Sequence, residues 1–109
     1  MIQNLNSIDF EKTINQATEL VLVDFHASIG CPACDTMKPI LEDLSKELTD
    51  VLIVKIDVKN KENESLFIRY GIRHVPSLLL FKEGNILDKQ IGKTSKMAMI
   101  DFIEKHKYC

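Results

Sequence analysis

Two short apolar runs restrict the fold of this chain more than any other feature of its sequence. Residues 20–25 and 51–58 are rich in Val, Leu and Ile and are bounded by polar segments. Runs of this kind are typical of central strands that are buried on both faces. Such strands need helices to cover them, so the sequence predicts a sheet between helical layers.

Apolar residues recur at helical spacing in four other segments. A helix from about Cys31 or Cys34 to residue 48 places Met37 and Leu41 on one side, and a shorter one over residues 62–70 ends at Gly71. The other two are expected to begin at Ser7 or Asp9, with Phe10, Ile14 and Ala17 inward, and after Thr94 or Ser95, with Met99, Phe102 and Ile103 inward. The methionines Met37, Met97 and Met99 are expected to fill the core.

The last strands of the chain are expected to form a hairpin. Residues 77–81 and 86–91 flank a turn that contains Gly84. Parallel central strands therefore come first and an antiparallel edge comes last. The predicted fold class is α/β, with a central mixed sheet of four to five strands flanked by about four helices, in a single domain of residues 1–109.

Charge and composition exclude several classes of function. The 109 residues carry 14 Lys and Arg against 16 Asp and Glu, and the basic residues are scattered, so neither a nucleic-acid nor a membrane surface is expected. No signal peptide or membrane-spanning run is recognisable, which predicts a cytoplasmic protein, expected to be a monomer. Three cysteines are too few, and odd in number, for a disulfide framework. In a reducing cytosol a close pair is expected to be catalytic or metal-binding.

Cys31, Pro32, Ala33 and Cys34 form the motif that carries chemistry. Cysteines three residues apart on a helix share one face and lie close enough for a disulfide after a small adjustment. At a helix N-terminus, free amide donors and the positive end of the dipole favour the thiolate. Cys31 is therefore the expected nucleophile and Cys34 the cysteine that resolves the mixed disulfide. Pro32 suits the first helical turn because its missing amide hydrogen costs nothing there.

Two other uses of the pair are possible from the sequence: half of a metal site, or a structural disulfide in a binding module. A zinc site needs about four ligands, and no second CxxC motif is present. We therefore expect no metal and no cofactor. The additional ligands that such a site would have to recruit are Cys109, His26, His74 and His106.

Five segments, in order along nearly the whole chain, resemble the thioredoxin family. They are residues 21–25, the pair Cys31 and Cys34 followed by Pro39, residues 54–58, residues 70–77 and residues 81–84. The resemblance implies a thioredoxin-like fold and a thiol–disulfide oxidoreductase. Its clients would be proteins that contain disulfides, and its expected electron donor is a thioredoxin reductase.

The resemblance also implies roles for individual residues. Asp24 matches the buried carboxylate that acts in a proton relay behind the resolving cysteine, and Lys55 matches the cation on the adjacent strand. Pro76 matches the cis-proline packed against the disulfide, where the backbone of Val75 would pair with an extended client. Gly30 and Pro32, on either side of Cys31, complete the expected client-binding residues.

The active-site segment departs from the family pattern in three ways. Gly30 and His26 stand where the family has tryptophans, residues 27–30 make a loop one residue longer, and Pro32 with Ala33 replaces Gly-Pro. A proline directly after the nucleophile is more like glutaredoxins or oxidising members of the family. A more oxidising, glutathione-linked or client-specific protein is therefore the alternative to a general disulfide reductase.

Overall fold

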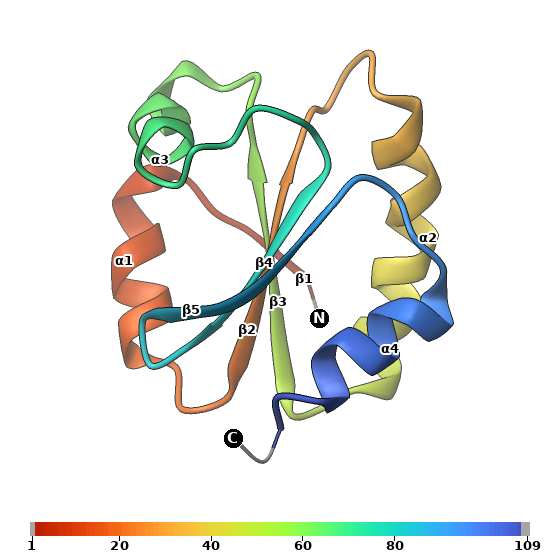
Figure 1. Ribbon diagram of the computed structural model, residues 1–109. Coiled ribbons are helices and arrows are strands. Elements are labelled where there is room, and N and C mark those ends of the chain that lie inside the picture. The colour runs from red at the N-terminus through yellow and green to blue at the C-terminus, as the bar shows by residue number, and fades with distance from the viewer. Residues whose placement is uncertain (1, 108–109) are drawn as a thin grey trace.

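A five-stranded sheet lies between two layers of helices (Figure 1). The computed structural model describes residues 2–107. The strand order is β1-β3-β2-β4-β5; β1, β2 and β3 run parallel, and β4 and β5 are antiparallel to their neighbours. The strands are β1 (Ile2–Asn4), β2 (Leu20–His26), β3 (Val51–Asp57), β4 (Ser77–Lys82) and β5 (Asn85–Ile91).

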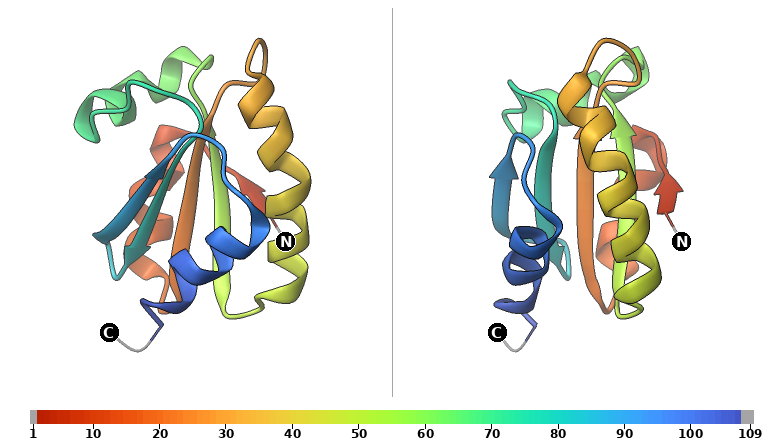
Figure 2. Two further views of the ribbon diagram at one scale, coloured as in Figure 1. Left: turned by 45° about the vertical axis from the view of Figure 1, so that its right-hand side comes forward. Right: turned by 90° about the vertical axis from the view of Figure 1, so that its right-hand side faces the viewer.

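Each face of the sheet is covered by two helices. In Figure 1, α1 (Ser7–Gln16) and α3 (Glu64–Arg69) lie on the left of the sheet, whereas α2 (Pro32–Glu47) and α4 (Lys96–Glu104) lie on the right. A short 3₁₀ turn, η1 (Lys61–Asn63), precedes α3. The two further views in Figure 2 show α2 along its length beside the sheet.

Residues of the central strands alternate between two cores, because successive side chains of a strand point to opposite faces. On the α2 side, Leu22 and Ile53 pack with Met37 and Met99. On the α1 side, Val23 packs with a separate group of buried residues. This group contains most of the aromatic contacts, which join Phe10, Phe25, Phe67, Tyr70 and Phe81. The expected strands buried on both faces are therefore confirmed.

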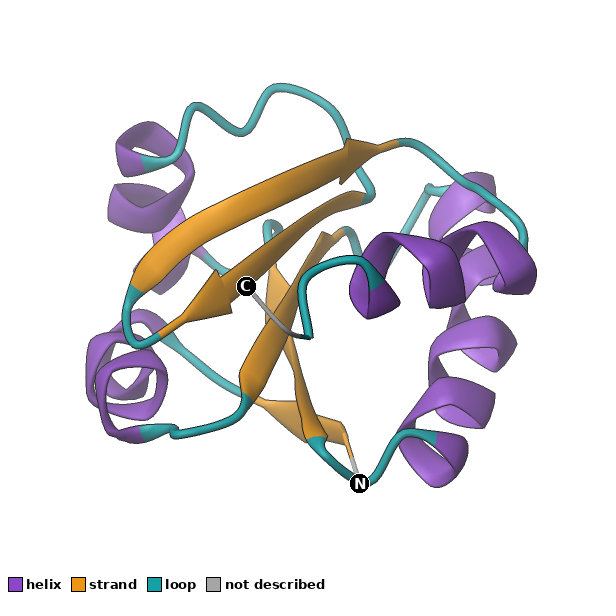
Figure 3. Ribbon diagram, turned by 60° about the horizontal axis from the view of Figure 1, so that its bottom comes forward, coloured by secondary structure: helices purple, strands orange, loops and turns teal. Residues whose placement is uncertain are grey.

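The predicted hairpin is also present (Figure 3). Lys82 and Asn85 pair across a two-residue turn whose central residues, Glu83 and Gly84, have positive φ angles of 51° and 82°. This conformation matches the right-handed twist of the flanking strands. Glycine adopts it without strain, which accounts for Gly84 at this position.

Several expected details differ from the structure. The cap of α1 is Asn6, not Ser7 or Asp9: its side-chain oxygen accepts the N–H groups of Ile8 and Asp9. The expected helix over residues 62–70 is the 3₁₀ turn followed by the six residues of α3.

Two further differences concern burial and pairing. Met97 is 67% exposed and does not fill the core, since it lies on the outer face of α4. The sequence predicts four to five strands but gives residue ranges for only four. The fifth strand is β1, which pairs with β3.

The topology brings the ends of three segments together. β2 and β3 run parallel and end at the same edge of the sheet, where the loop from β2 enters α2 (Figure 1). The segment before β4 reaches the same edge, because β4 starts opposite the end of β2 with Ser77 beside Phe25. Within residues 2–107, no helix is long and apolar enough to cross a membrane.

Candidate active site

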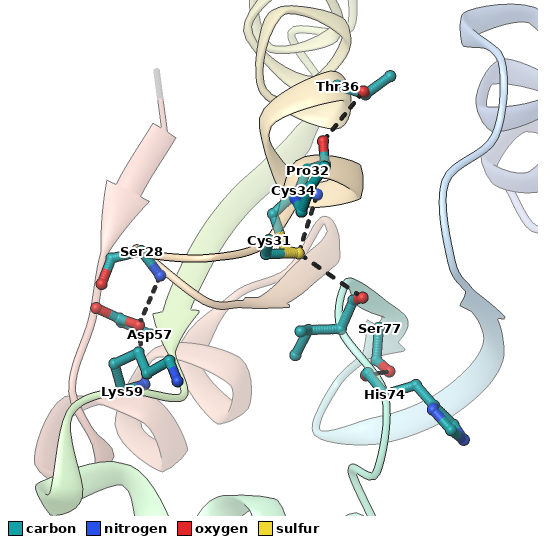
Figure 4. The surroundings of a disulfide bond; sticks show 10 residues. Ser28, Cys31, Pro32, Cys34, Thr36, Asp57, Lys59, His74 and Ser77 are labelled. Carbon is teal, nitrogen blue, oxygen red and sulfur yellow. Dashed lines mark hydrogen bonds between the residues drawn. A yellow bond between two sulfur atoms is a disulfide. The ribbon is translucent and has the colours of Figure 1, made fainter.

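Cys31 and Cys34 form a disulfide at the N-terminus of α2 (Figure 4). Cys31 is the cap residue of the helix, and its Sγ accepts the backbone N–H of Cys34 at 3.1 Å. Its carbonyl oxygen accepts the N–H of Asp35 at 3.1 Å, so α2 begins directly after Cys31. Only 7% of Cys31 and 8% of Cys34 are exposed, which leaves a narrow approach to either sulfur.

The residues beside Cys31 set the direction in which the chain enters the helix. Pro32 occupies the first helical position, where a proline loses no hydrogen bond. Gly30 is exposed and has a φ of 74°, a left-handed conformation in which a side chain is strained. Ile29, just before it, is 76% exposed and is the large apolar side chain of this loop.

Val75 and Pro76 lie on the other side of the disulfide. The Cys31 Sγ is 3.8 Å from the carbonyl oxygen of Val75, and the Val75–Pro76 peptide bond is cis. The N–H of Gly92 donates to the carbonyl oxygen of Pro76 at 2.8 Å, which ties this segment to the end of β5. Figure 4 shows the segment directly facing Cys31.

Asp24 is a buried carboxylate on β2. It is 2% exposed, and its Oδ1 has no hydrogen-bond partner among the residues that the structure describes. Burial raises the pKa of Asp24 from 3.8 to about 6, and the opposite charge of Lys55 works against this rise. Lys55 is the register partner of Asp24 on β3, yet it does not satisfy that oxygen. The sequence would also allow a carboxylate that is simply paired with its neighbouring lysine, and the structure does not support that alternative.

Asp57, which the sequence analysis did not single out, holds the active-site loop. Its Oδ1 accepts the N–H of Ser28 at 3.1 Å and that of Lys59 at 2.9 Å (Figure 4). Burial alone would raise the pKa of Asp57, but these hydrogen bonds outweigh it and the pKa is lowered. The sequence does contain a signal for this role. Asp57 is a carboxylate at the end of a buried strand, and that strand runs parallel to the one that leads into the active-site loop.

An open groove of about 530 Å³ runs along the α2 side of the disulfide. Cys34, His26 and Lys55 line it together with Lys38 and Asp35 of α2. The groove therefore joins the surroundings of Cys34 to solvent.

The remaining candidate residues lie apart from this groove. His74 is exposed, and Figure 4 shows its ring pointing away from the disulfide. The imidazole of His106 contacts Asp88 at 2.9 Å near the end of the chain. Cys109 lies outside the described residues. Among residues 2–107, no group of three or more His, Cys, Asp or Glu side chains is placed to hold a metal ion.

The Thioredoxin family model matches residues 1–105. The chain belongs to the thioredoxin family. It is 35% identical over 106 residues to a thioredoxin of Rickettsia typhi, covering 96% of this chain and 98% of the relative. It is 36% identical over 106 residues to thioredoxin C-2 of Corynebacterium nephridii, covering 96% of this chain and 95% of the relative.

Solved thioredoxin structures have the same fold. Thioredoxin f2 of Chlamydomonas reinhardtii superposes with a TM-score of 0.88 at 29% identity, covering 98% of this chain and 97% of that one. Thioredoxin NaTrxh of Nicotiana alata gives a TM-score of 0.86 at 29% identity, covering 97% of this chain and 92% of that one. Family membership and the redox-active cysteine pair identify this chain as a thiol–disulfide oxidoreductase.

Replacing Asp57 by alanine is expected to loosen the active-site loop. The variant leaves the N–H groups of Ser28 and Lys59 without their acceptor, which costs roughly 1–2 kcal/mol of unfolding free energy at a half-exposed site. Urea unfolding and amide hydrogen exchange at Ser28 measure both effects. The control Asp57→Asn keeps an acceptor oxygen and should lose less. Unchanged exchange at Ser28 in the alanine variant would contradict this role.

Proposed function

We propose that this thioredoxin reduces protein disulfides by dithiol–disulfide exchange, with Cys31 as nucleophile and Cys34 as resolving cysteine. The observation that carries the proposal is the position of Cys31 as the cap of α2, with its Sγ accepting the amide N–H of Cys34. In the reduced protein, this donor and the positive end of the helix dipole favour a thiolate at Cys31. Cys34 lies one turn further into the helix.

The exchange has two steps. The Cys31 thiolate attacks one sulfur of the client disulfide, forms a mixed disulfide and releases the first client thiolate. Cys34 then loses its proton and attacks the Cys31 sulfur, which forms the disulfide seen in the structure and releases the second client thiolate. We assign Asp24 as the acceptor of that proton, because its pKa of about 6 leaves it ionised at neutral pH but readily protonated. Lys55 helps to keep it ionised.

The client would bind along the segment of Val75 and Pro76. An extended peptide that pairs with the backbone of Val75 would place its disulfide over Cys31, whose Sγ lies 3.8 Å from the Val75 carbonyl oxygen. Gly30 and Pro32 border the same approach, and neither has a bulky side chain to block it. Ile29 offers an exposed apolar surface in a loop that has no tryptophan.

Proteins that contain disulfides are the proposed clients, and a thioredoxin reductase is the proposed electron donor. The exchange forms and breaks bonds only at sulfur, with Asp24 as the proton acceptor, and needs no bound cofactor. The monomeric state and the cytoplasmic location expected from the sequence remain predictions.

Turnover of a model protein disulfide tests the proposed direction. With a thioredoxin reductase and its reductant in excess, catalytic amounts of this protein should accelerate reduction of the model disulfide. No acceleration, with the pair shown to be intact by thiol titration, would overturn the proposal.

A more oxidising protein is the second candidate, and Pro32 directly after the nucleophile favours it. Equilibration with glutathione distinguishes the two. At equilibrium with a glutathione buffer of fixed cytosolic potential, an oxidising member has the higher reduction potential and is mostly reduced, whereas a low-potential reductase keeps a larger oxidised fraction.

A further inference from the structure

Four ionisable side chains form a compact group under the N-terminal end of α2. In the parallel register, Asp24 lies beside Lys55, and His26 lies beside Asp57. All four belong to the strand positions that face α2, because they continue the alternation of the buried residues Leu22 and Ile53 on that side. We call these four residues the ionisable quartet. Two of them, Asp24 and Lys55, already have roles in the proposed exchange.

His26 differs from Asp24 in its access to solvent. The carboxylate of Asp24 is sealed in the interior, with an oxygen that accepts no hydrogen bond from any described residue. His26 is half-buried and lines the open groove that Cys34 and Lys55 also line. Its backbone is fixed, since its carbonyl oxygen accepts the N–H of Val58 at 2.7 Å. Of the quartet's possible proton acceptors, His26 is therefore the one that shares a solvent-filled space with the resolving cysteine.

We propose that His26 exchanges protons with Cys34 during the resolving step, as a second acceptor beside Asp24 and as the outlet to solvent. This inference rests on the proposed function. The proton leaves the Cys34 thiol for the neutral imidazole through the groove, which gives a Cys34 thiolate and an imidazolium. The thiolate attacks the Cys31 sulfur, the bond between Cys31 and the client breaks, and the client leaves as a thiolate. The imidazolium then returns its proton to solvent or to the departing thiolate.

The surroundings of His26 keep its imidazole unprotonated, so that it is available to accept a proton. Burial lowers the pKa of His26, and the positive charges of Lys55 and, more weakly, Lys38 lower it further. Asp57 opposes this shift. The other charged groups around this space are Asp24 on β2 and Asp35, Glu42 and Lys46 on α2. The backbone of Ala27 also works against the lowering of the pKa of His26, but burial and the two lysines outweigh it.

The pKa shifts of Asp24 and His26 determine how the rate of the resolving step depends on pH. Asp24, with a pKa of about 6, and His26, with a pKa below its ordinary 6.5, are both unprotonated at pH 7. Asp24 loses its ability to accept a proton as the pH falls through about 6, and His26 loses it as the pH falls through its lowered pKa. Removal of one acceptor leaves the other to sustain resolution, so the two substitutions should reinforce each other.

A stopped-flow experiment separates the two steps of exchange. The reduced protein is mixed with an aromatic disulfide whose thiol is coloured: the first coloured thiol reports attack by Cys31, and the second reports resolution by Cys34. His26→Asn is neutral at pH 7, as the imidazole is, and should slow only the second release, by several-fold. In an Asp24→Asn background, His26→Asn should slow it by about a further tenfold, within the range of general acid–base catalysis.

The pH profile distinguishes proton exchange from a structural effect. The Asp24→Asn protein should retain a fall in the second rate below pH 6.5, and the double variant should lose it. His106→Asn, which removes an imidazole at the far end of the chain, is the matched control and should leave the profile unchanged. Identical profiles for Asp24→Asn and the double variant would overturn the role of His26. Absence of the first release would instead overturn the proposed nucleophile.

Discussion

Replacing Cys31 by serine is expected to lower the turnover of a model protein disulfide on the order of 10³-fold or more, because the hydroxyl is not ionised at neutral pH and cannot replace the thiolate. Little change in stability of the reduced protein should accompany the loss, since serine is nearly the size of cysteine and its oxygen can still accept the N–H of Cys34. Initial rates with excess reductant measure the effect. Equal rates for wild type and Cys31→Ser would remove Cys31 as the nucleophile.

The companion variant Cys34→Ser should separate attack from resolution. Cys31 can still form a mixed disulfide with the client, but no neighbouring thiol releases it. A covalent complex of one protein and one client should therefore accumulate, and mass spectrometry under non-reducing conditions should show it through Cys31. The double variant Cys31→Ser/Cys34→Ser is the control and should form no such complex. If a complex forms through Cys34 in the Cys31→Ser variant and none forms in the Cys34→Ser variant, the assigned roles are reversed.

The sequence was sufficient for features whose cause is local. The apolar runs of β2 and β3 predict strands buried on both faces, and the cysteine spacing predicts a pair at the start of a helix. Both are confirmed, as are the edge hairpin at Gly84 and the inward positions of Met99 and Phe102 on α4.

Features that depend on distant partners were not predictable in the same way. β1 has three residues and exists because β3 offers it a parallel edge. Asn6 caps α1 because the hydroxyl of the competing Ser7 donates to the carbonyl oxygen of Glu62. Asp57 looks like an ordinary strand-end acid until the loop with Ser28 folds beside it.

Asp24 shows how both kinds of information combine. A lone acid inside the apolar run of β2 indicates an unusual site, because burying a carboxylate without a partner is costly. The sequence left open whether Lys55 relieves this cost. The structure shows a carboxylate oxygen with no hydrogen-bond partner among residues 2–107, beside a lysine that only moderates the pKa of Asp24. The cost of burying this carboxylate should lower the free energy of unfolding when Asp24 is ionised.

Replacing Asp24 by asparagine is expected to stabilise the oxidised protein at alkaline pH relative to wild type. In the folded protein the pKa of Asp24 is about 6 rather than 3.8, so between these values the folded state binds more protons than the unfolded state. The free energy of unfolding therefore falls as pH rises through this window, by about 3 kcal/mol in all for a group this buried. The asparagine variant has no such proton to lose.

Urea unfolding of both proteins at pH 4 and pH 8 measures the effect. The difference between variant and wild type should shift in favour of the variant by about 2 kcal/mol from the lower to the higher pH, less than the whole change because pH 4 is already just above the ordinary pKa of 3.8. The comparison isolates Asp24, because the lowered pKa of His26 makes an opposite contribution that both proteins share to a first approximation. A difference that does not change with pH would contradict the raised pKa. The same variant should resolve mixed disulfides more slowly, because it lacks the proposed proton acceptor.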